Sequence, residues 1–481
     1  MYYDEDKPTK IDYTLQPDSI TKLDRTGEVP LVPLDMERQE LYVPELLKPT
    51  KEDGEDIYYH IIAQNGETEI IPNVKSQTSG YNGSFLGPVM KLRQGKHYHI
   101  TTENQLDEVT TYHWHGLIVP EQADGGCRMQ VQPGEKTEVN FEMINEASTY
   151  WFHPHPHEIS PQQIYKGLTG LIINEDNNSD RLKGLIPDNY GVDDLPIITW
   201  DRFFDDSGQL DFESIQDSDG NRGDVLLING TPMAKVSVEK RFLRLRLLNA
   251  ANVTNFKYEL SNGAEFYQIA TDGGFLNYPT SLDTLWLTPA ERAEIVIDLD
   301  KIDSDRVYLM VNDYHGLEIN IANHLEKNVD FNYGITLRPA DNLINIVRPK
   351  EIKDLNSKFF SYTGTGGNVV INNRKFDMWR SDEFQPKDTS YVWRVVNTSG
   401  GEIDIVHNVH IHATQFRILA RDGKVPPKNE MGYKDTAVIS PGETVDLLVE
   451  FPIPGVFMYH CHNFAHENNG MMGNVEVTEE N

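Results

Sequence analysis

The feature that most constrains the fold is a segment that occurs three times along the 481-residue chain. Each copy opens with a proline turn and continues with alternating apolar and polar residues, as in a strand with one buried face. The copies are PGEKTEVNFEM from Pro133, PAERAEIVIDL from Pro289 and PGETVDLLVEF from Pro441, which are 156 and 152 residues apart. Upstream of each copy lies a strand that ends in asparagine, at Asn104, Asn249 and Asn397.

A repeat of about 150 residues predicts three units of one fold. Within each unit, short alternating segments are bounded by Gly, Pro, Asn and Asp, and few stretches have the period of a helix. This pattern indicates an all-β protein built from three Greek-key β-sandwiches. We expect an acidic arm at residues 1–35, followed by domains at 36–180, 181–345 and 346–481.

The charge balance excludes some partners. Asp and Glu number 75 against 43 Lys and Arg, which gives a net charge of −32. Such a surface disfavours nucleic acid and anionic membranes, and no apolar run of about 18 residues is present to form a transmembrane helix. Because the start MYYDEDKPTK lacks the basic and apolar parts of a secretory signal, we expect a cytoplasmic protein. We also expect it to be a monomer.

Eleven of the sixteen histidines fall in four short clusters. The clusters are HWHG with His113 and His115, FHPHPH with His153, His155 and His157, HNVHIH with His407, His410 and His412, and HCHNFAH with His460, His462 and His466. Residues i and i+2 of a strand share a face, so each His-x-His presents two imidazoles together. Four such pairs, from the first and third units, would supply eight nitrogens at one interface. Imidazole suits copper, zinc, iron and nickel alike.

The fourth cluster is more selective about the metal. In His460-Cys461-His462 the alternation turns the thiolate to the face opposite its two neighbours. Cys461 can then meet His407 and His466, with Met471 as a weak axial partner. Two histidines, one thiolate and a distant thioether describe a blue-copper electron-transfer site. The same three residues would touch both metal centres and offer electrons a covalent route.

Together these motifs resemble those of the multicopper oxidase family, in particular its bacterial three-domain, laccase-like and copper-efflux-oxidase-like type. The resemblance covers the chain from about Gly80 to Gly473, and the four motifs occur in the family order. It implies cupredoxin-like domains and four copper ions: one type 1, one type 2 and a type 3 pair. The second domain, without ligands, would act as a spacer.

The resemblance also assigns the ligands. It implies type 1 ligands at His407, Cys461, His466 and Met471; type 2 ligands at His113 and His410; and type 3 ligands at His115, His153, His155, His412, His460 and His462. The remaining cysteine, Cys127, and the third histidine of the second cluster, His157, are not expected to be ligands.

Two acids match carboxylates that pass protons to the copper cluster in similar oxidases. Asp124 follows the first histidine pair by nine residues, and Glu467 directly follows His466. Reducing dioxygen to two waters consumes four electrons and four protons, so a buried cluster needs a positioned proton donor. The alternative for Asp124 is a loop aspartate that caps its own turn.

The sequence constrains the reducing substrate less. Cuprous oxidases of the family carry a methionine-rich insert in the third domain, because thioethers hold Cu(I). Between Arg348 and Gly400 only Met378 occurs. We therefore expect laccase-like oxidation of phenols and aromatic amines at the type 1 copper, coupled to reduction of dioxygen to water. Two alternatives stay open: a metallo-oxidase of Cu(I), Fe(II) or Mn(II), and a non-enzymatic protein that keeps the fold as a scaffold.

Overall fold

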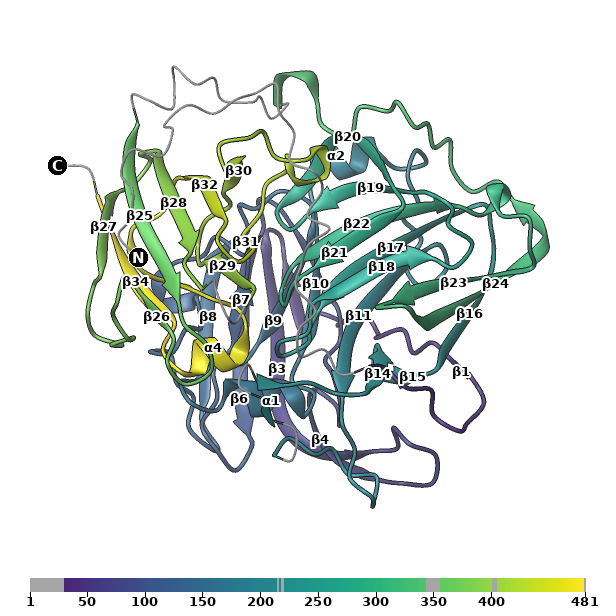
Figure 1. Ribbon diagram of the computed structural model, residues 1–481, viewed down its shortest axis with the longest axis horizontal. Helices are drawn as coiled ribbons and strands as arrows, with labels where there is room; N and C mark the ends of the chain where they lie inside the picture. Colours follow the sequence, from purple (N-terminus) through teal and green to yellow (C-terminus); the bar gives the residue numbers. More distant parts are fainter. Residues whose placement is uncertain (1–29, 214–215, 218–219, 343–354, 400–404, 480–481) are drawn as a thin grey trace.

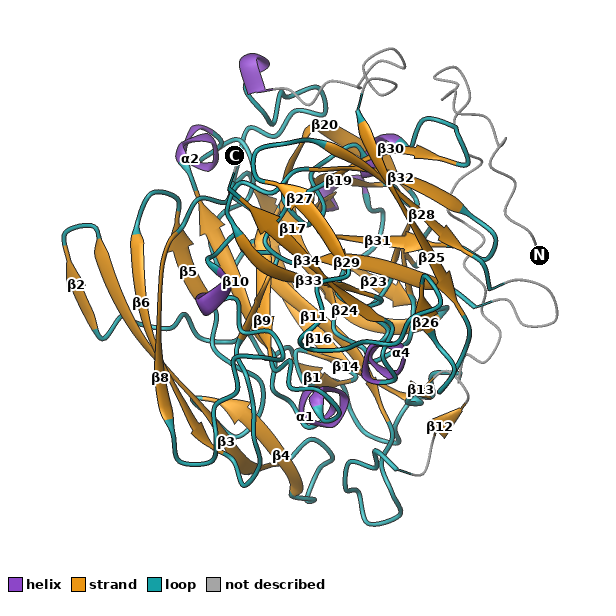
Figure 2. Ribbon diagram, turned by 90° about the vertical axis from the view of Figure 1, so that its left-hand side faces the viewer, coloured by secondary structure: helices purple, strands orange, loops and turns teal. Residues whose placement is uncertain are grey.

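The computed structural model of the chain describes residues 30–213, 216–217, 220–342, 355–399 and 405–479. Strands dominate this part of the chain, which confirms the all-β prediction (Figure 2). The α-helices within it are short: α1 Ser160–Tyr165, α2 Asn177–Arg181 and α4 Phe464–Asn468, with 3-10 turns at η1 Glu121–Ala123, η2 Leu299–Lys301, η3 Ala340–Asn342 and η4 Lys428–Glu430. Among the described residues, no helix has the length and apolar character needed to cross a bilayer.

The first unit packs two sheets around a shared core that includes Trp114, Phe141 and Phe152. One sheet has the order β2-β3-β6-β8, with β4 paired to β3: β2 Lys51–Asp53, β3 Asp56–Thr68, β4 Ser76–Tyr81, β6 His97–Gln105 and β8 Lys136–Glu142. The other has the order β5-β10-β9-β7: β5 Met90–Arg93, β10 Gly170–Glu175, β9 Thr149–His153 and β7 His113–His115.

The second unit is the largest. Its first sheet has the order β1-β16-β24-β23-β18-β21: β1 Gln39–Glu40, β16 Ala234–Lys240, β24 Tyr314–Glu326, β23 Arg306–Val311, β18 Phe256–Leu260 and β21 Thr284–Leu287. Its second sheet has the order β15-β14-β11-β17-β22-β19-β20: β15 Thr231–Pro232, β14 Val225–Ile228, β11 Asp194–Arg202, β17 Phe242–Asn249, β22 Arg292–Asp298, β19 Phe266–Thr271 and β20 Gly274–Leu282. A short ribbon joins β12 Gln216–Asp217 and β13 Gly220–Asn221.

The early strand β1 pairs with β16 of the second unit, in parallel. By sequence position these residues were expected in a first domain that begins at residue 36. The backbone pairing instead extends the sheet of the second unit with a strand from the start of the chain. Along the chain, a strand of the second unit's sheet therefore precedes the strands of the first unit.

The third unit again has two sheets around one core. The first has the order β26-β25-β28-β32-β30: β26 Val370–Ile371, β25 Asn356–Thr363, β28 Tyr391–Asn397, β32 Thr444–Val449 and β30 Arg417–Arg421. The second has the order β27-β34-β33-β29-β31: β27 Glu383–Pro386, β34 Met472–Thr478, β33 Gly455–His460, β29 His407–Ile411 and β31 Thr436–Ile439.

The repeated segments of the sequence occupy equivalent strands. In each unit the strand that ends in asparagine pairs antiparallel with the strand after the proline turn: β6 with β8, β17 with β22, and β28 with β32. The asparagines Asn104, Asn249 and Asn397 each donate to two backbone carbonyls and accept one backbone N–H. A buried amide bonded in this way fixes the loop that leaves the strand, which explains why it recurs.

The three units meet at the centre of the molecule. In Figure 1 the yellow and light green strands of the third unit lie on the left, and the teal strands of the second unit lie on the right. A buried cluster joins Trp151 of the first unit, Trp200 and Leu248 of the second, and Phe464 of α4. This shared core holds α4 against strand β9, next to the histidine clusters.

Candidate metal centre

Two strand pairings bring the histidine clusters together. In the first unit β7 runs antiparallel to β9, with His113 opposite His153. In the third unit β29 runs antiparallel to β33, with His410 opposite His460. The other members of the clusters follow within two residues of these strand ends. All eight histidines predicted as type 2 and type 3 ligands, which together would hold a trinuclear copper cluster, therefore face one buried space.

The first of two histidine trios joins the first and third units. His115 Nδ1 lies 3.4 Å from His153 Nε2 and 3.2 Å from His462 Nε2. A first-row ion with nitrogen ligands about 2.0–2.1 Å away sets two ligands roughly 3.3 Å apart at a tetrahedral angle. The spacing of these three nitrogens therefore fits a shared metal ion.

The second trio has the same construction. His460 Nε2 lies 3.3 Å from His155 Nε2 and 3.1 Å from His412 Nε2. Beside it are His113 and His410, whose Nδ1 atoms each lie 2.8 Å from a backbone carbonyl oxygen. The Nε2 atoms of this pair are buried and have no hydrogen-bond partner among the described residues. Buried polar atoms are almost always bonded, so two orphaned nitrogens in one space point to a missing ligand such as a metal ion.

A separate group surrounds Cys461. Its Sγ lies 3.7 Å from His407 Nδ1 and 3.6 Å from His466 Nδ1, and these two nitrogens are 3.2 Å apart. Met471 is buried in the same core cluster, and its carbonyl accepts the backbone N–H of Cys461 at 3.1 Å. His466 sits on α4, where the Asn463 side chain caps the first turn. The chain thus brings together a thiol, two imidazoles and a thioether-bearing residue.

Burial favours the neutral form of seven histidines in the two trios and the pair. Removal from water lowers the pKa of these seven: His113, His115, His153, His155, His410, His412 and His462. Because a metal ion binds the neutral ring, this environment leaves nitrogen lone pairs available at ordinary pH. The donor set, its spacing and its protonation state all fit copper, which imidazole and thiolate ligands favour.

Both predicted acids lie against the trios. Asp124 Oδ2 lies 2.8 Å from His412 Nδ1, and burial raises the pKa of the Asp124 carboxyl. Glu467 lies 3.5 Å from His155 Nδ1 and 3.3 Å from His460 Nδ1. Burial alone would raise the pKa of Glu467, but the two imidazoles hold it below its ordinary value.

Several contacts of the ligand groups were not anticipated from the sequence. Ser399 Oγ lies 2.9 Å from His407 Nε2 and fixes that ring from behind. The carboxylate of Asp435 lies 3.0 Å from His115 Nε2, and its backbone carbonyl accepts from His410. None of these residues belongs to a short motif. Their role in orienting the histidines is visible only from their distances to the rings in the folded chain.

The two residues that were set aside as ligands lie at the edge of the site. Cys127 is a buried free thiol whose Sγ is 3.6 Å from His155 Nδ1, and it packs against Met458. His157 stacks on Phe376, with ring centroids 5.6 Å apart. Neither belongs to a group of converging ligand atoms among the described residues.

Comparisons with known proteins agree with this geometry. Family models described as multicopper oxidase match residues 63–179, 197–330 and 347–481. The multicopper oxidase mco of Staphylococcus haemolyticus (strain JCSC1435) is 39% identical over 441 residues, which cover 92% of this chain and 93% of that protein.

Solved structures give the same picture. The structure of a laccase from Pediococcus acidilactici Pa5930 superimposes with a TM-score of 0.88 and 35% identity, covering 99% of this chain and 98% of that one. A multicopper oxidase from Campylobacter jejuni, described as a metallo-oxidase, has a TM-score of 0.78 and 25% identity, covering 94% and 98%.

Proposed function

The chain belongs to the multicopper oxidase family, and from this premise we propose that it is laccase-like, oxidising phenols and aromatic amines one electron at a time. As a family member it is a copper-dependent oxidase that transfers electrons from a reducing substrate or metal ion to dioxygen. The relatives at 38–39% identity are multicopper oxidases, which supports an oxidase rather than the scaffold without activity that the sequence left open.

The observation that carries the proposal is the adjacency of the two ligand groups. His460 and His462 belong to different trios, and Cys461 between them belongs to the cysteine group. We assign His407, Cys461, His466 and Met471 to type 1 copper, His113 and His410 to type 2, and the two trios to the type 3 pair. Copper bound at these positions supplies one-electron acceptance at the cysteine group and four-electron reduction of dioxygen to water at the trios.

The chain itself supplies the connection and the environment. The peptide bonds on either side of Cys461 join both groups, so electrons have a covalent path only a few bonds long. Burial of the rings excludes bulk water from the ligand groups. Contacts of the second ring nitrogen with carbonyl, carboxylate or hydroxyl oxygens orient several of the rings, as metal sites generally require: those of His113, His115, His407, His410 and His412.

We assign the proton supply to Asp124 and Glu467. Burial raises the pKa of the Asp124 carboxyl above its ordinary value, whereas the neighbouring imidazoles of His155 and His460 lower the pKa of Glu467. Two acids whose environments push their pKa values apart are suited to donor and acceptor roles. Each touches a histidine of the second trio, so a proton has a short distance to travel.

We propose organic substrates rather than Cu(I) because the sequence directly before the type 1 ligand His407 lacks methionine. The segment EIDIV before His407 contains no methionine. Met378 packs against the cluster of Cys127, Met458 and Met472. The sequence before His407 therefore lacks the methionine-rich insert that holds Cu(I) in the cuprous oxidases of the family.

Kinetics of the copper-loaded protein test this assignment. We expect about four copper ions per chain, and a higher kcat/KM for a phenol or an aromatic amine than for Cu(I) or Fe(II). A higher kcat/KM for a metal ion would favour the metallo-oxidase instead. That second candidate is supported by the net charge of −32, which attracts cations, and by the likeness to the Campylobacter jejuni protein. Copper-loaded protein that consumes no dioxygen with any of these reductants would refute both.

A monomeric state is proposed as well, to be measured by size-exclusion chromatography.

A further inference from the structure

The second unit contributes no histidine to either ligand group, yet it reaches the trios through a buried ion pair. Arg292 is the first residue of β22, and Asp435 lies directly before β31 of the third unit. Both side chains are fully buried. Arg292 Nη1 donates to Asp435 Oδ1 at 2.7 Å, and Nη2 donates to Oδ2 at 2.6 Å. This two-point geometry is the strongest form of an arginine–carboxylate contact.

Every N–H of the Arg292 guanidinium is occupied. Nε donates to the backbone carbonyl of Thr149 in the first unit at 3.0 Å. Nη1 also donates to the carbonyl of Ala290, and Nη2 to that of Asp272. Since an arginine offers five donors in a fixed plane, five partners leave it one position. Arg292 therefore ties the three units together at a single point.

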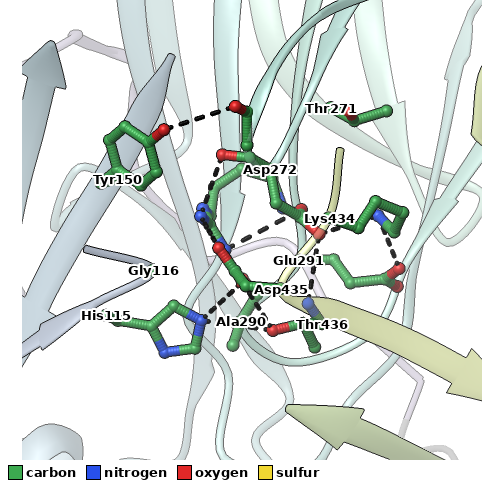
Figure 3. Close-up of polar contacts among 12 residues, drawn as sticks. His115, Gly116, Tyr150, Thr271, Asp272, Ala290, Glu291, Lys434, Asp435 and Thr436 are labelled. Atoms are coloured by element: carbon green, nitrogen blue, oxygen red, sulfur yellow. Dashed lines mark hydrogen bonds and ion pairs between the residues drawn. The ribbon is translucent and has the colours of Figure 1, made fainter. Parts of the chain in front are cut away.

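Asp435 transmits this position to two histidines. Its Oδ1 accepts from His115 Nε2 at 3.0 Å (Figure 3). Its backbone carbonyl accepts from His410 Nδ1 at 2.8 Å. Each hydrogen bond places the proton on that nitrogen and leaves the other nitrogen of the ring for a metal ion. His115 is thereby committed to Nδ1 and His410 to Nε2, the atoms that face the trios.

Gly116, the residue after His115, lies directly against the ion pair of Arg292 and Asp435. Gly116 has φ +86°, and a Cβ built there would lie 2.4 Å from Asp435 Oδ2 and 2.9 Å from Arg292 Nη2. No side chain fits without moving the ion pair. The turn that carries His115 is thus set directly by the position of the carboxylate.

The network continues into the second unit. Lys434 Nζ lies 2.9 Å from Asp272 Oδ2 and 3.2 Å from Glu291 Oε1 (Figure 3). Asp272 Oδ1 in turn accepts the backbone N–H of Arg292 at 2.7 Å. The backbone at the start of β22 is therefore held by the same charges that hold the Arg292 side chain.

We propose that Arg292 is a positioning residue for the trinuclear copper ligands: by holding the Asp435 carboxylate it sets the rings of His115 and His410, so the second unit controls copper retention without contributing a ligand. The inference rests on the proposed function, because it concerns the copper ions assigned there. It replaces the expectation that the second domain is only a spacer.

The test compares Arg292→Met with Arg246→Met. Arg246 is a matched control, since it is buried in the second unit, bonds Asp194 at two points of 2.7 Å, and reaches Thr149 Oγ1 of the first unit at 3.0 Å. No histidine of the site contacts it in the described residues. Copper per chain, the blue absorption of type 1 copper and the electron paramagnetic resonance signal of type 2 copper are measured during dialysis against a chelator.

We expect Arg292→Met to lose trinuclear copper 10–100-fold more readily than the unchanged protein, the usual effect of removing an outer partner of a metal ligand. The blue absorption should remain, and the type 2 signal should change in shape. Arg246→Met should retain both copper populations. Equal copper retention in the two variants would overturn the inference.

A second variant separates positioning from folding. Arg292→Met combined with Asp435→Leu removes both charges, and apolar pairs often restore the stability lost with one partner. We expect the double variant to regain thermal stability and still lose trinuclear copper. Recovery of copper together with stability would show a purely structural role. If the unchanged protein binds no copper, the proposed function fails instead, and this outcome is distinct.

Discussion

Replacing Gly116 by alanine should cost far more than its small size suggests. The left-handed backbone at φ +86° costs an alanine about 1–2 kcal/mol. The added Cβ would also stand 2.4 Å from Asp435 Oδ2 and 2.9 Å from Arg292 Nη2, and such overpacking costs about 1–3 kcal/mol. The sum is about 2–5 kcal/mol. The urea midpoint of unfolding should fall by this free energy divided by the m-value, which increases with the surface exposed on unfolding.

Gly134 provides the control for this experiment. It has φ +80°, but a Cβ there meets no atom within 4 Å. Gly134→Ala should therefore carry only the backbone term of about 1–2 kcal/mol and lower the midpoint less than Gly116→Ala does. The assay is urea unfolding of metal-free protein followed by circular dichroism, with copper retention measured on loaded samples. If Gly116→Ala matches Gly134→Ala in both measurements, the carboxylate does not set the turn that carries His115.

Further predictions address the copper chemistry and the pH dependence. Cys461→Ser should abolish the blue absorption and oxidase turnover while histidine-bound copper remains by metal analysis; turnover at the native rate would contradict the covalent electron path. Met471→Leu should raise the type 1 potential in a redox titration, because loss of an axial donor disfavours Cu(II), and a lowered potential would argue against this ligand. Asp124→Asn should slow turnover with dioxygen by about 10²-fold or more without slowing anaerobic bleaching of the blue colour by a phenol; unchanged turnover would remove Asp124 from the proton supply. Metal-free protein should lose stability as the pH falls below about 6.5, since the buried histidines with lowered pKa bind fewer protons folded than unfolded; equal urea midpoints at pH 7.5 and 5.5 would contradict this.

The parts of the site that could be predicted depend on local backbone geometry. Side chains alternate along an extended backbone, so the spacing of His460, Cys461 and His462 was enough to predict a thiol on one face and two imidazoles on the other, although β33 itself ends at His460. The three proline-turn segments likewise predicted equivalent strands, because the turn and the alternating pattern lie within one short stretch. The ligand assignments themselves stay predictions until copper is measured.

The ion pair that holds the trios could not be predicted in this way. Arg292 and Asp435 are 143 residues apart, and neither belongs to a motif. Arg292 occupies the fourth position of the second repeat, where the first repeat has the exposed Lys136 and the third has Thr444. By comparison with Lys136, Arg292 would be expected to be exposed at the surface. Only the contact between the units buries it, and contacts at such sequence separation leave no periodic signal.

The same limit applies to the start of the chain. Gln39 and Glu40 are polar and exposed, so nothing in their pattern indicates which sheet they extend. Their pairing with β16 depends on backbone hydrogen bonds, which any residue except proline can make. Proximity in sequence to the first unit was therefore a poor guide to their place in the fold.

Each histidine trio draws on both ends of the polypeptide, and this has a consequence for when the protein can acquire its metal. His115 and His462 are 347 residues apart. At a synthesis rate of about 5–20 residues per second, the ribosome makes them roughly 20–70 s apart. A growing chain thus carries half-formed sites for most of its synthesis, and none can trap an ion with a full set of donors. The trios can therefore bind a metal ion with a full set of donors only after both the first and the third unit have been synthesised.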